Sequence, residues 1–400
     1  MAVVGTAAIP SFLTRAALGA VQPNAADKRL VVIFQRGAAD GLNIVIPHAE
    51  KAYYAMRPSI NIPRQQVIDL NGFFGLHPSL SSLKPLWDQK HLAIVHAAGS
   101  PDQTRSHFDA QNYMESGTPR VKSTPDGWLN RALQTERDPA DSPFRAVALG
   151  TSLPRILAGK SPAVAVNNVN GFGIGGGNPT AAPMGKTFEA MYAESVDSVM
   201  HGTGRETFEA VKMLKAADPQ RYRPDAGANY PKGRFGDALR QTAQLIKSNV
   251  GVQIAFTDIG GWDHHVNEGA ADGQLASVLR DFSQAIAAFW IDLGSLAEET
   301  VLVTMSEFGR TARENGNRGT DHGHANVMLV LGGQVRGGKV YGRWPGLDPS
   351  QLHDGRDLAV TTDFRTVLGE TVARHLGNRE LTTVFPGFEN SPTSFLRFLG

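Results

Sequence analysis

Acids and histidines gather in two short segments of the chain. In the first segment, Glu307 precedes an Asp-His-Gly-His run at residues 321–324. In the second, Asp258 precedes a Gly-Gly-Trp-Asp-His-His run at residues 260–265. Carboxylates and imidazoles are the ligands that zinc and related divalent ions take when no cysteine is present. Two such segments in one chain predict a hydrolytic centre that holds two metal ions.

The candidate metal ligands are acids and histidines that lie next to predicted strands. They are Asp40, Asp258, His264, His265, Glu307, Asp321, His322 and His324. Two divalent ions about 4 Å apart can hold both the attacking and the leaving oxygen of an in-line displacement. We expect zinc, with calcium, magnesium or manganese as alternatives. Adjacent His264 and His265 would point in opposite directions in extended backbone, so we expect one of them to bind metal.

A hydroxyl nucleophile is predicted at Ser106, with Thr104 as the second candidate. Ser106 stands where a Gly-Ser-Pro loop gives way to a predicted helix. The positive end of that helix, together with a metal ion, would lower the pKa of the hydroxyl. Arg36 and Arg105 are the candidates for binding an anionic substrate, because a guanidinium can hold an oxyanion through two hydrogen bonds.

Purely structural roles are the alternatives for several of these residues. Ser106 with Asp109 three positions later also fits the capping pattern of a helix N-terminus. Asp40 before Gly41 fits a tight turn, and so does Asp258. Three ionisable groups within residues 321–324 are harder to explain as a loop cap, so that segment favours metal binding or catalysis.

Six apolar runs predict buried strands. They lie at residues 30–34, 92–96, 145–149, 252–257, 301–305 and 327–331. Helical patterns lie between them, at residues 108–116, 187–200, 207–217, 234–248, 273–296 and 363–376. Continuous apolar runs separated by helices predict an α/β fold, a three-layer αβα sandwich with a mostly parallel central sheet.

The candidate residues follow the predicted strands, where open α/β sheets bind their ligands. Arg36 and Asp40 follow the first run, residues 99–109 follow the second, and Asp258 and Glu307 follow two later runs. The run at residues 327–331 instead comes after its cluster. An antiparallel strand there would bring residues 321–324 to the same edge, but the sequence leaves its direction open.

The composition limits which fold sizes, partners and ligands the protein can have. At 400 residues and 41% hydrophobic content, the chain can bury a large core as one α/β domain or two smaller ones. Its 39 basic and 38 acidic side chains give no global field for nucleic acid or an anionic membrane, whereas a small anionic ester substrate can still be held locally. The absence of cysteine excludes disulfides, thiolate ligands and formylglycine made from cysteine. The oligomeric state is not indicated.

Residues 1–26 are small and apolar, with no acid before Asp27. They resemble the rear half of an export signal, with a flexible arm as the alternative. Gly5 and Pro10 interrupt the run, which is too short to span a bilayer. We therefore expect a periplasmic or extracellular protein whose folded domain covers residues 27–400.

Six motifs carry a family resemblance that spans nearly the whole chain. They occupy residues 36–43, 105–117, 260–265, 305–311, 321–325 and 362–365. With them the sequence resembles the DUF1501 family of exported bacterial proteins, in the alkaline phosphatase and sulfatase superfamily. The resemblance implies an alkaline-phosphatase-like sandwich with a divalent-metal site.

The resemblance also implies roles for individual residues. Asp40 matches an early metal ligand, Asp258 with His264 or His265 matches a second ligand pair, and Asp321-His322 matches a third. The nucleophile position falls on Ser106 or His107. Phe308 stands where related strands end in Asp-His, which predicts one altered metal position. The implied function is a metal-dependent hydrolase of phosphate or sulfate esters. The alternative is a non-catalytic exported scaffold or binding protein with a degenerate metal site.

Overall fold

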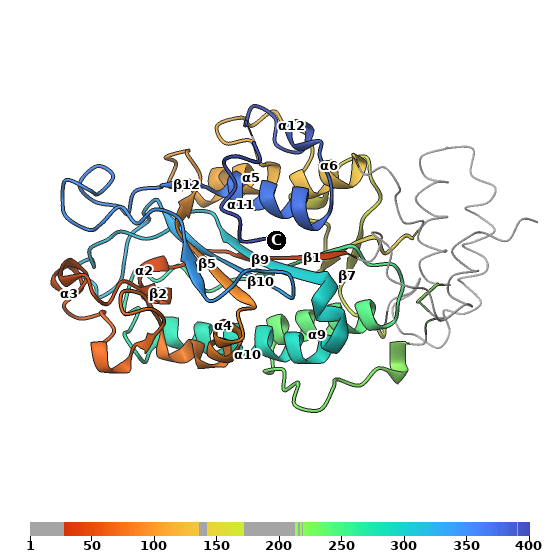
Figure 1. Cartoon of the computed structure of the whole chain (residues 1–400), viewed down its shortest axis with the longest axis horizontal. Coiled ribbons are helices and arrows are strands. Elements are labelled where there is room, and N and C mark those ends of the chain that lie inside the picture. The colour runs from red at the N-terminus through yellow and green to blue at the C-terminus, as the bar shows by residue number, and fades with distance from the viewer. Residues whose placement is uncertain (1–27, 136–141, 172–212, 215–216, 218, 390) are drawn as a thin grey trace, which may run out of the picture.

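A mixed sheet of nine strands forms the middle layer of the protein (Figure 1). The computed structural model describes residues 28–135, 142–171, 213–214, 217, 219–389 and 391–400. In spatial order the strands are β11 (Lys339–Tyr341), β5 (Leu92–Gly99), β10 (Asn326–Gly332), β9 (Thr300–Ser306), β1 (Arg29–Gln35), β8 (Ile254–Ile259), β6 (Ala146–Leu149) and β7 (Val164–Val166), and β12 (Thr362–Asp363) pairs with β5. Only β10 runs antiparallel to its neighbours among these strands.

Helices cover both faces of this sheet (Figure 1). One face carries α4 (Lys84–Asp88), α9 (Arg234–Lys247) and α10 (Gln274–Leu293), and the other carries α5 (His107–Ser116), α6 (Trp128–Gln134), α11 (Phe364–Glu370) and α12 (Leu381–Val384). Val31 and Ile33 of β1 pack into the core on the α9 and α10 side, whereas Val32 and Phe34 pack into the core on the α6 and α11 side. Burial on both faces explains why the strands are continuous apolar runs.

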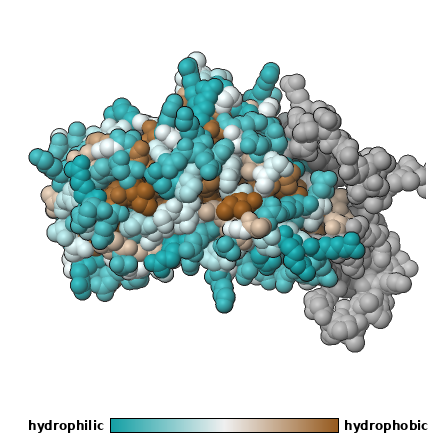
Figure 2. All heavy atoms as spheres, turned by 60° about the horizontal axis from the view of Figure 1, so that its bottom comes forward, coloured by the Kyte–Doolittle hydropathy of each residue, from teal (hydrophilic) through white to brown (hydrophobic). Residues whose placement is uncertain are grey.

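Shorter elements complete the fold. A small antiparallel sheet contains β2 (Val45–Ile46), β4 (Gly75–Leu76) and β3 (Ile68–Asp69). The short helices are α2 (Gly41–Ile44) and α3 (Lys51–Met56), and the helical turns are η2 (Arg64–Gln66), η3 (Pro78–Leu83), η4 (Arg155–Leu157), η5 (Pro219–Arg221), η6 (Gly294–Glu299) and the π-helical η7 (Thr371–His375). On the face that Figure 2 shows, hydrophilic side chains predominate and apolar ones gather in small patches.

The structure confirms the three-layer αβα architecture and all six predicted strands. It also resolves the direction of the strand left open by the sequence, because β10 is antiparallel. The predicted helices at residues 108–116, 234–248 and 273–296 correspond to α5, α9 and α10, and that at 363–376 to α11 followed by η7. The predicted export segment 1–26, the predicted helix 187–200 and most of the predicted helix 207–217 lie outside the described residues.

Strand register brings the candidate residues to one edge of the sheet. Gln35, the last residue of β1, pairs with Ser306 on one side and with Ile259 on the other. The three parallel strands therefore end level, and the segments that follow them leave the sheet together. β10 begins at this same edge because it runs in the opposite direction. No helix in the described part of the chain is long and apolar enough to cross a membrane.

Candidate metal centre

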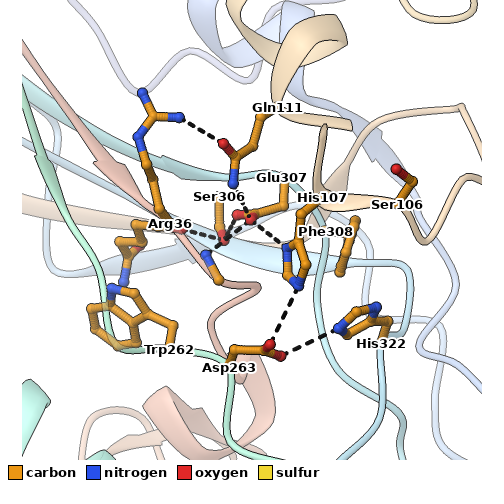
Figure 3. A network of polar contacts seen from close by, with 12 residues as sticks. Arg36, Ser106, His107, Gln111, Trp262, Asp263, Ser306, Glu307, Phe308 and His322 are labelled. Atoms are coloured by element: carbon orange, nitrogen blue, oxygen red, sulfur yellow. Dashed lines mark hydrogen bonds and ion pairs between the residues drawn. The ribbon is translucent and has the colours of Figure 1, made fainter. Parts of the chain in front are cut away.

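Three side chains from distant segments meet at this edge. His107 is the first residue of α5, Asp263 lies in the loop after β8, and His322 lies in the loop before β10. Their ligand atoms all lie within 4.8 Å of one another. Asp263 Oδ2 is 3.6 Å from His107 Nε2, and Asp263 Oδ1 is 3.2 Å from His322 Nε2 (Figure 3). Ligand atoms of a tetrahedral zinc site lie about 3.3 Å apart, so these distances suit a shared ion.

A third imidazole adjoins this group. His265 Nε2 lies 3.0 Å from Asp263 Oδ1 and 3.0 Å from His322 Nε2. Its side chain is 39% exposed, compared with 45% for Asp263 and 21% for His322. The group is therefore open to solvent on one side and buried on the other. We call His107, Asp263, His265 and His322 the metal centre.

The other ring nitrogen of each imidazole faces an acceptor. His107 Nδ1 lies 2.8 Å from Glu307 Oε1, and His265 Nδ1 lies 3.1 Å from Asp321 Oδ1. His322 Nδ1 lies 2.9 Å from the backbone carbonyl of Arg105. Because a carbonyl or an ionised carboxylate can only accept, each Nδ1 carries the proton and donates it. In a neutral ring the Nε2 atom then presents a lone pair to the metal centre.

The Nε2 atoms and the Asp263 carboxylate are thus four acceptor groups that face one another. His107 Nε2 is buried and has no hydrogen-bond partner among the described residues. Lone pairs at 3.0–3.2 Å repel unless a cation lies between them, whether a proton or a metal ion. Metal-bound histidines typically donate their second N–H to a carboxylate or carbonyl in this way. The residues present therefore fit a divalent metal ion.

Glu307 orients His107 through a hydrogen bond and is not itself one of the grouped metal-ligand candidates. Its Oε1 accepts from the backbone N–H of Gly37, from His107 and from Gln111 Nε2 at 2.8–2.9 Å (Figure 3). Its Oε2 lies 3.0 Å from Ser306 Oγ. Burial opposes the ionisation of Glu307, but these donors, first among them His107, lower its pKa. The same hydrogen bond raises the pKa of His107.

Two glycines allow the segments of the metal centre to approach closely. Gly37 has a φ of +119°, and a Cβ there would lie 3.0 Å from the backbone nitrogen of Asp263. A Cβ on Gly323 would lie 2.3 Å from the backbone of Arg310, which forms an isolated bridge with His322. Larger residues at these positions would displace the backbone of Asp263 and of Arg310.

The structure pairs Asp40 with arginine instead of placing it in the metal centre. Asp40 Oδ1 accepts from Arg57 Nη2 at 3.0 Å, and Asp40 Oδ2 accepts from Arg57 Nη1. Burial opposes the ionisation of Asp40, but the Arg57 guanidinium outweighs burial and lowers the carboxyl's pKa. Beside this pair, burial and the charge of Asp40 raise the pKa of Glu268 well above its usual range. We call Asp40, Arg57 and Glu268 the buried ion-pair network.

Asp258 and Arg36 are also engaged with each other. Arg36 Nε donates to Asp258 Oδ2 at 2.7 Å, and Arg234 Nη2 donates to Asp258 Oδ1 at 2.8 Å. Arg36 Nη1 donates to Gln111 Oε1 at 2.9 Å and pairs with Glu115. Figure 3 shows this guanidinium next to Gln111, on the far side of Glu307 from Asp263. Arg36, a predicted anion-binding residue, thus donates to Gln111, which in turn donates a hydrogen bond to Glu307.

The remaining predicted residues surround the metal centre. Asp321 orients His265, as described above. His324 Nε2 lies 3.0 Å from the carbonyl of Ser100, and burial lowers its pKa. Arg105 Nη2 donates to Asp357 Oδ2 at 2.6 Å. Ser106 caps α5, with its Oγ 3.5 Å from the backbone nitrogen of Asp109, and Figure 3 shows it apart from the metal centre.

His264 and His265 have different neighbours, although the backbone there forms tight turns in place of the extended conformation that the prediction assumed. The side chain of His264 is buried, and burial followed by the charge of Arg310 lowers its pKa to about 4. Asp263 and Arg310 were not predicted as site residues from the sequence motifs. Asp263 is the acid of the Gly-Gly-Trp-Asp-His-His run at residues 260–265, but the prediction took Asp258, which precedes that run, and the two histidines instead. Arg310 follows Glu307 by three positions and carried no recognised ligand pattern.

Comparison with known proteins gives a family and distant structural neighbours. The family model described as "Protein of unknown function (DUF1501)" matches residues 27–383. No curated protein matches the sequence. Solved structures that align include PsFucS1 sulfatase from Pseudoalteromonas sp., at 12% identity over 92% of this chain and 72% of that chain, with a TM-score of 0.45.

Two further solved structures align at lower similarity. The C-terminal periplasmic domain of EcEptC from Escherichia coli, in complex with Zn, has 9% identity over 76% of this chain and 73% of that chain, with a TM-score of 0.35. The phosphonate monoester hydrolase of Agrobacterium radiobacter has 9% identity over 91% of this chain and 78% of that chain, with a TM-score of 0.36.

Proposed function

The chain belongs to the DUF1501 family, and we propose that it is an exported, metal-dependent hydrolase of phosphate or sulfate esters. One observation carries the proposal. Three imidazoles have their Nδ1 atoms held by acceptors, and their Nε2 atoms face the carboxylate of Asp263. The export part of the proposal rests on the composition of residues 1–26.

We infer that zinc is the metal. Imidazole nitrogens suit zinc and other late transition metals, whereas calcium and magnesium favour sites made of oxygen ligands. His107, His265 and His322 would supply nitrogen, and Asp263 would supply oxygen. A bound zinc ion polarises an ester oxygen and lowers the pKa of a water molecule, which is the chemistry that ester hydrolysis needs.

The chain's own residues would orient this chemistry. Glu307 fixes the ring of His107, and Gln111 links Glu307 to Arg36. Hydrogen bonds therefore hold the buried side of the metal centre in place. Asp321 and the carbonyl of Arg105 fix the other two rings on the exposed side. A substrate would therefore approach from the exposed side, where Asp263 and His265 are 45% and 39% exposed.

The test combines metal content with turnover. We expect untreated protein to contain zinc and zinc-loaded protein to hydrolyse at least one member of a panel of aryl phosphate, phosphodiester and sulfate esters. Because Asp263 touches two of the three imidazoles, we expect Asp263→Asn to lower zinc affinity by more than about 100-fold and to abolish turnover. The exposed Asp272→Asn is the matched control, and we expect it to retain both properties.

Other outcomes would contradict the proposal. A protein that binds none of zinc, manganese, calcium and magnesium is no metal-dependent hydrolase. A protein that binds zinc tightly but hydrolyses no ester of the panel would fit the alternative, a metal-binding scaffold. The exposed capping position of Ser106 favours that alternative, because it leaves the predicted hydroxyl outside the metal centre.

A further inference from the structure

Arg310 carries a buried guanidinium whose hydrogen-bonding capacity is unused. The residue is 2% exposed, and Nε, Nη1 and Nη2 have no hydrogen-bond partner among the described residues. Nη2 lies 2.9 Å from Asp263 Oδ1, an ion-pair distance without the alignment of a hydrogen bond. An arginine side chain stays protonated in proteins, so its N–H donors cannot be removed by ionisation. Buried polar groups are normally paired, and a buried cation with free donors calls for a partner.

Burial alone does not explain the free donors, because another buried arginine in this protein is well paired. Arg57 is 0% exposed, yet it donates to Asp40 and to the carbonyls of Thr311 and Ala312. Arg36 and Arg105, which the sequence predicted to bind the anion, are engaged with Asp258 and Asp357 respectively. Arg310 therefore differs from them in having donors left for a ligand.

Two further buried atoms without hydrogen-bond partners belong to histidine rings on which the charge of this guanidinium acts. They are His107 Nε2 and His264 Nδ1. Arg310 also acts on Asp263 and His322 of the metal centre. The positive charge is thus placed next to the group that would hold the metal ion.

We propose that Arg310 binds a non-bridging oxygen of a tetrahedral oxyanion, the phosphoryl or sulfuryl group of the substrate. This inference rests on the proposed function of the metal centre. The Asp263 carboxylate oxygen at 2.9 Å marks where an anionic oxygen can stand in front of the guanidinium. Carboxylate and phosphate oxygens are interchangeable partners for arginine, whose planar fork matches both. Asp263 Oδ1 lies next to Nη2 alone, so the unpaired Nε and Nη1 donors remain for a substrate oxygen while Asp263 stays in the metal centre.

Anion binding by the zinc-loaded protein tests the inference directly. Isothermal titration calorimetry with inorganic phosphate and with inorganic sulfate would be run on the wild type, Arg310→Lys and Arg310→Met. We expect binding of at least one anion, weakened about 10-fold by the lysine variant and about 100-fold by the methionine variant. Arg120→Met is the matched control, because Arg120 is 66% exposed and pairs with Asp102 near the start of α5. We expect it to bind the anion like the wild type.

Zinc affinity, measured by chelator competition, separates anion binding from support of the metal centre. Zinc affinity kept within about threefold while anion affinity falls would support the inference. Parallel loss of zinc and anion, anion affinity unchanged in both variants, or a wild type that binds neither anion would overturn it. If Arg310→Met does not fold, the comparison between Arg310→Lys and the wild type decides alone, and a difference within twofold overturns the inference.

Turnover of the ester panel distinguishes this inference from the proposed function. A wild type that binds the anion through Arg310 but hydrolyses no ester would contradict the proposed function and leave the inference standing. Hydrolysis that is unaffected in Arg310→Met would do the reverse.

Discussion

The metal centre and the buried ion-pair network stand at the same edge of the sheet and use the same kinds of side chain. In the network, Asp40 and Arg57 are 1% and 0% exposed, and both oxygens of Asp40 accept from the Arg57 guanidinium. In the metal centre, acceptors face acceptors, and His107 Nε2 and the Arg310 donors have no hydrogen-bond partner among the described residues. The polar atoms of the first region are paired, whereas the second region keeps polar atoms without partners among the described residues.

This difference shows that the type of a residue indicates its role less well than the groups with which its side chain pairs. An acid after a strand is a metal-ligand candidate in both regions, yet Asp263 faces the Nε2 atoms of imidazoles whereas Asp40 faces a guanidinium. A buried ion pair that is already satisfied holds the fold together, whereas unsatisfied groups that converge at a surface mark a binding site.

The largest effect is expected from Arg57→Met in the buried ion-pair network. It leaves Asp40 charged and buried without its partner, so we expect a loss of about 3–5 kcal/mol in the free energy of unfolding. Urea denaturation followed by circular dichroism measures this loss, and zinc affinity should persist in the folded fraction. A fully stable variant that loses zinc would show that the network belongs to the metal centre.

A smaller effect is expected from Glu307→Gln behind the metal centre. The amide keeps the size of the side chain but removes the charge that holds His107 Nδ1–H, so we expect zinc affinity to fall by about 10–100-fold. Chelator competition measures zinc affinity, and Glu298→Gln, an acid on the η6 segment, serves as the control. Unchanged zinc affinity in Glu307→Gln would mean that His107 needs no orienting partner.

The smallest effect is expected from Ser106→Ala. Ser106 caps α5 through a long hydrogen bond at an exposed position, so its loss should lower the free energy of unfolding by about 0.5–1 kcal/mol. Zinc affinity and any esterase turnover should remain. A fall in turnover of about 1,000-fold or more with zinc still bound would instead restore Ser106 as the nucleophile.

The sequence predicted the framework of this protein better than its site. The strands were found because burial on both faces leaves continuous apolar runs, as in β1 and β9. The same reasoning placed Glu307 and Asp258 at the correct edge. It could not tell that Glu307 would orient His107 or that Asp258 would pair with Arg36, because those partners lie 200 and 222 positions away in the chain.

Contacts between distant segments also explain why some residues of the site were not predicted from the sequence. Asp263, His264 and His265 follow one another, and only the approach of Gly37 and His322 decides which of their atoms face the metal centre. Arg310 could be recognised only because its buried donors have no hydrogen-bond partner among the described residues. That is a property of packing and has no sequence pattern. The helix α6 was likewise not predicted, since its seven residues give too short a periodic signal.

The reversed direction of β10 has a consequence for how tolerant the protein is to change elsewhere. Glu307, Arg310 and His322 all lie on one connection, closed at its base by the adjacent antiparallel strands β9 and β10. Backbone hydrogen bonds between Gly309 and the 323–324 segment close it again near its middle. Insertions or deletions in distant loops should therefore leave the mutual placement of these three side chains intact.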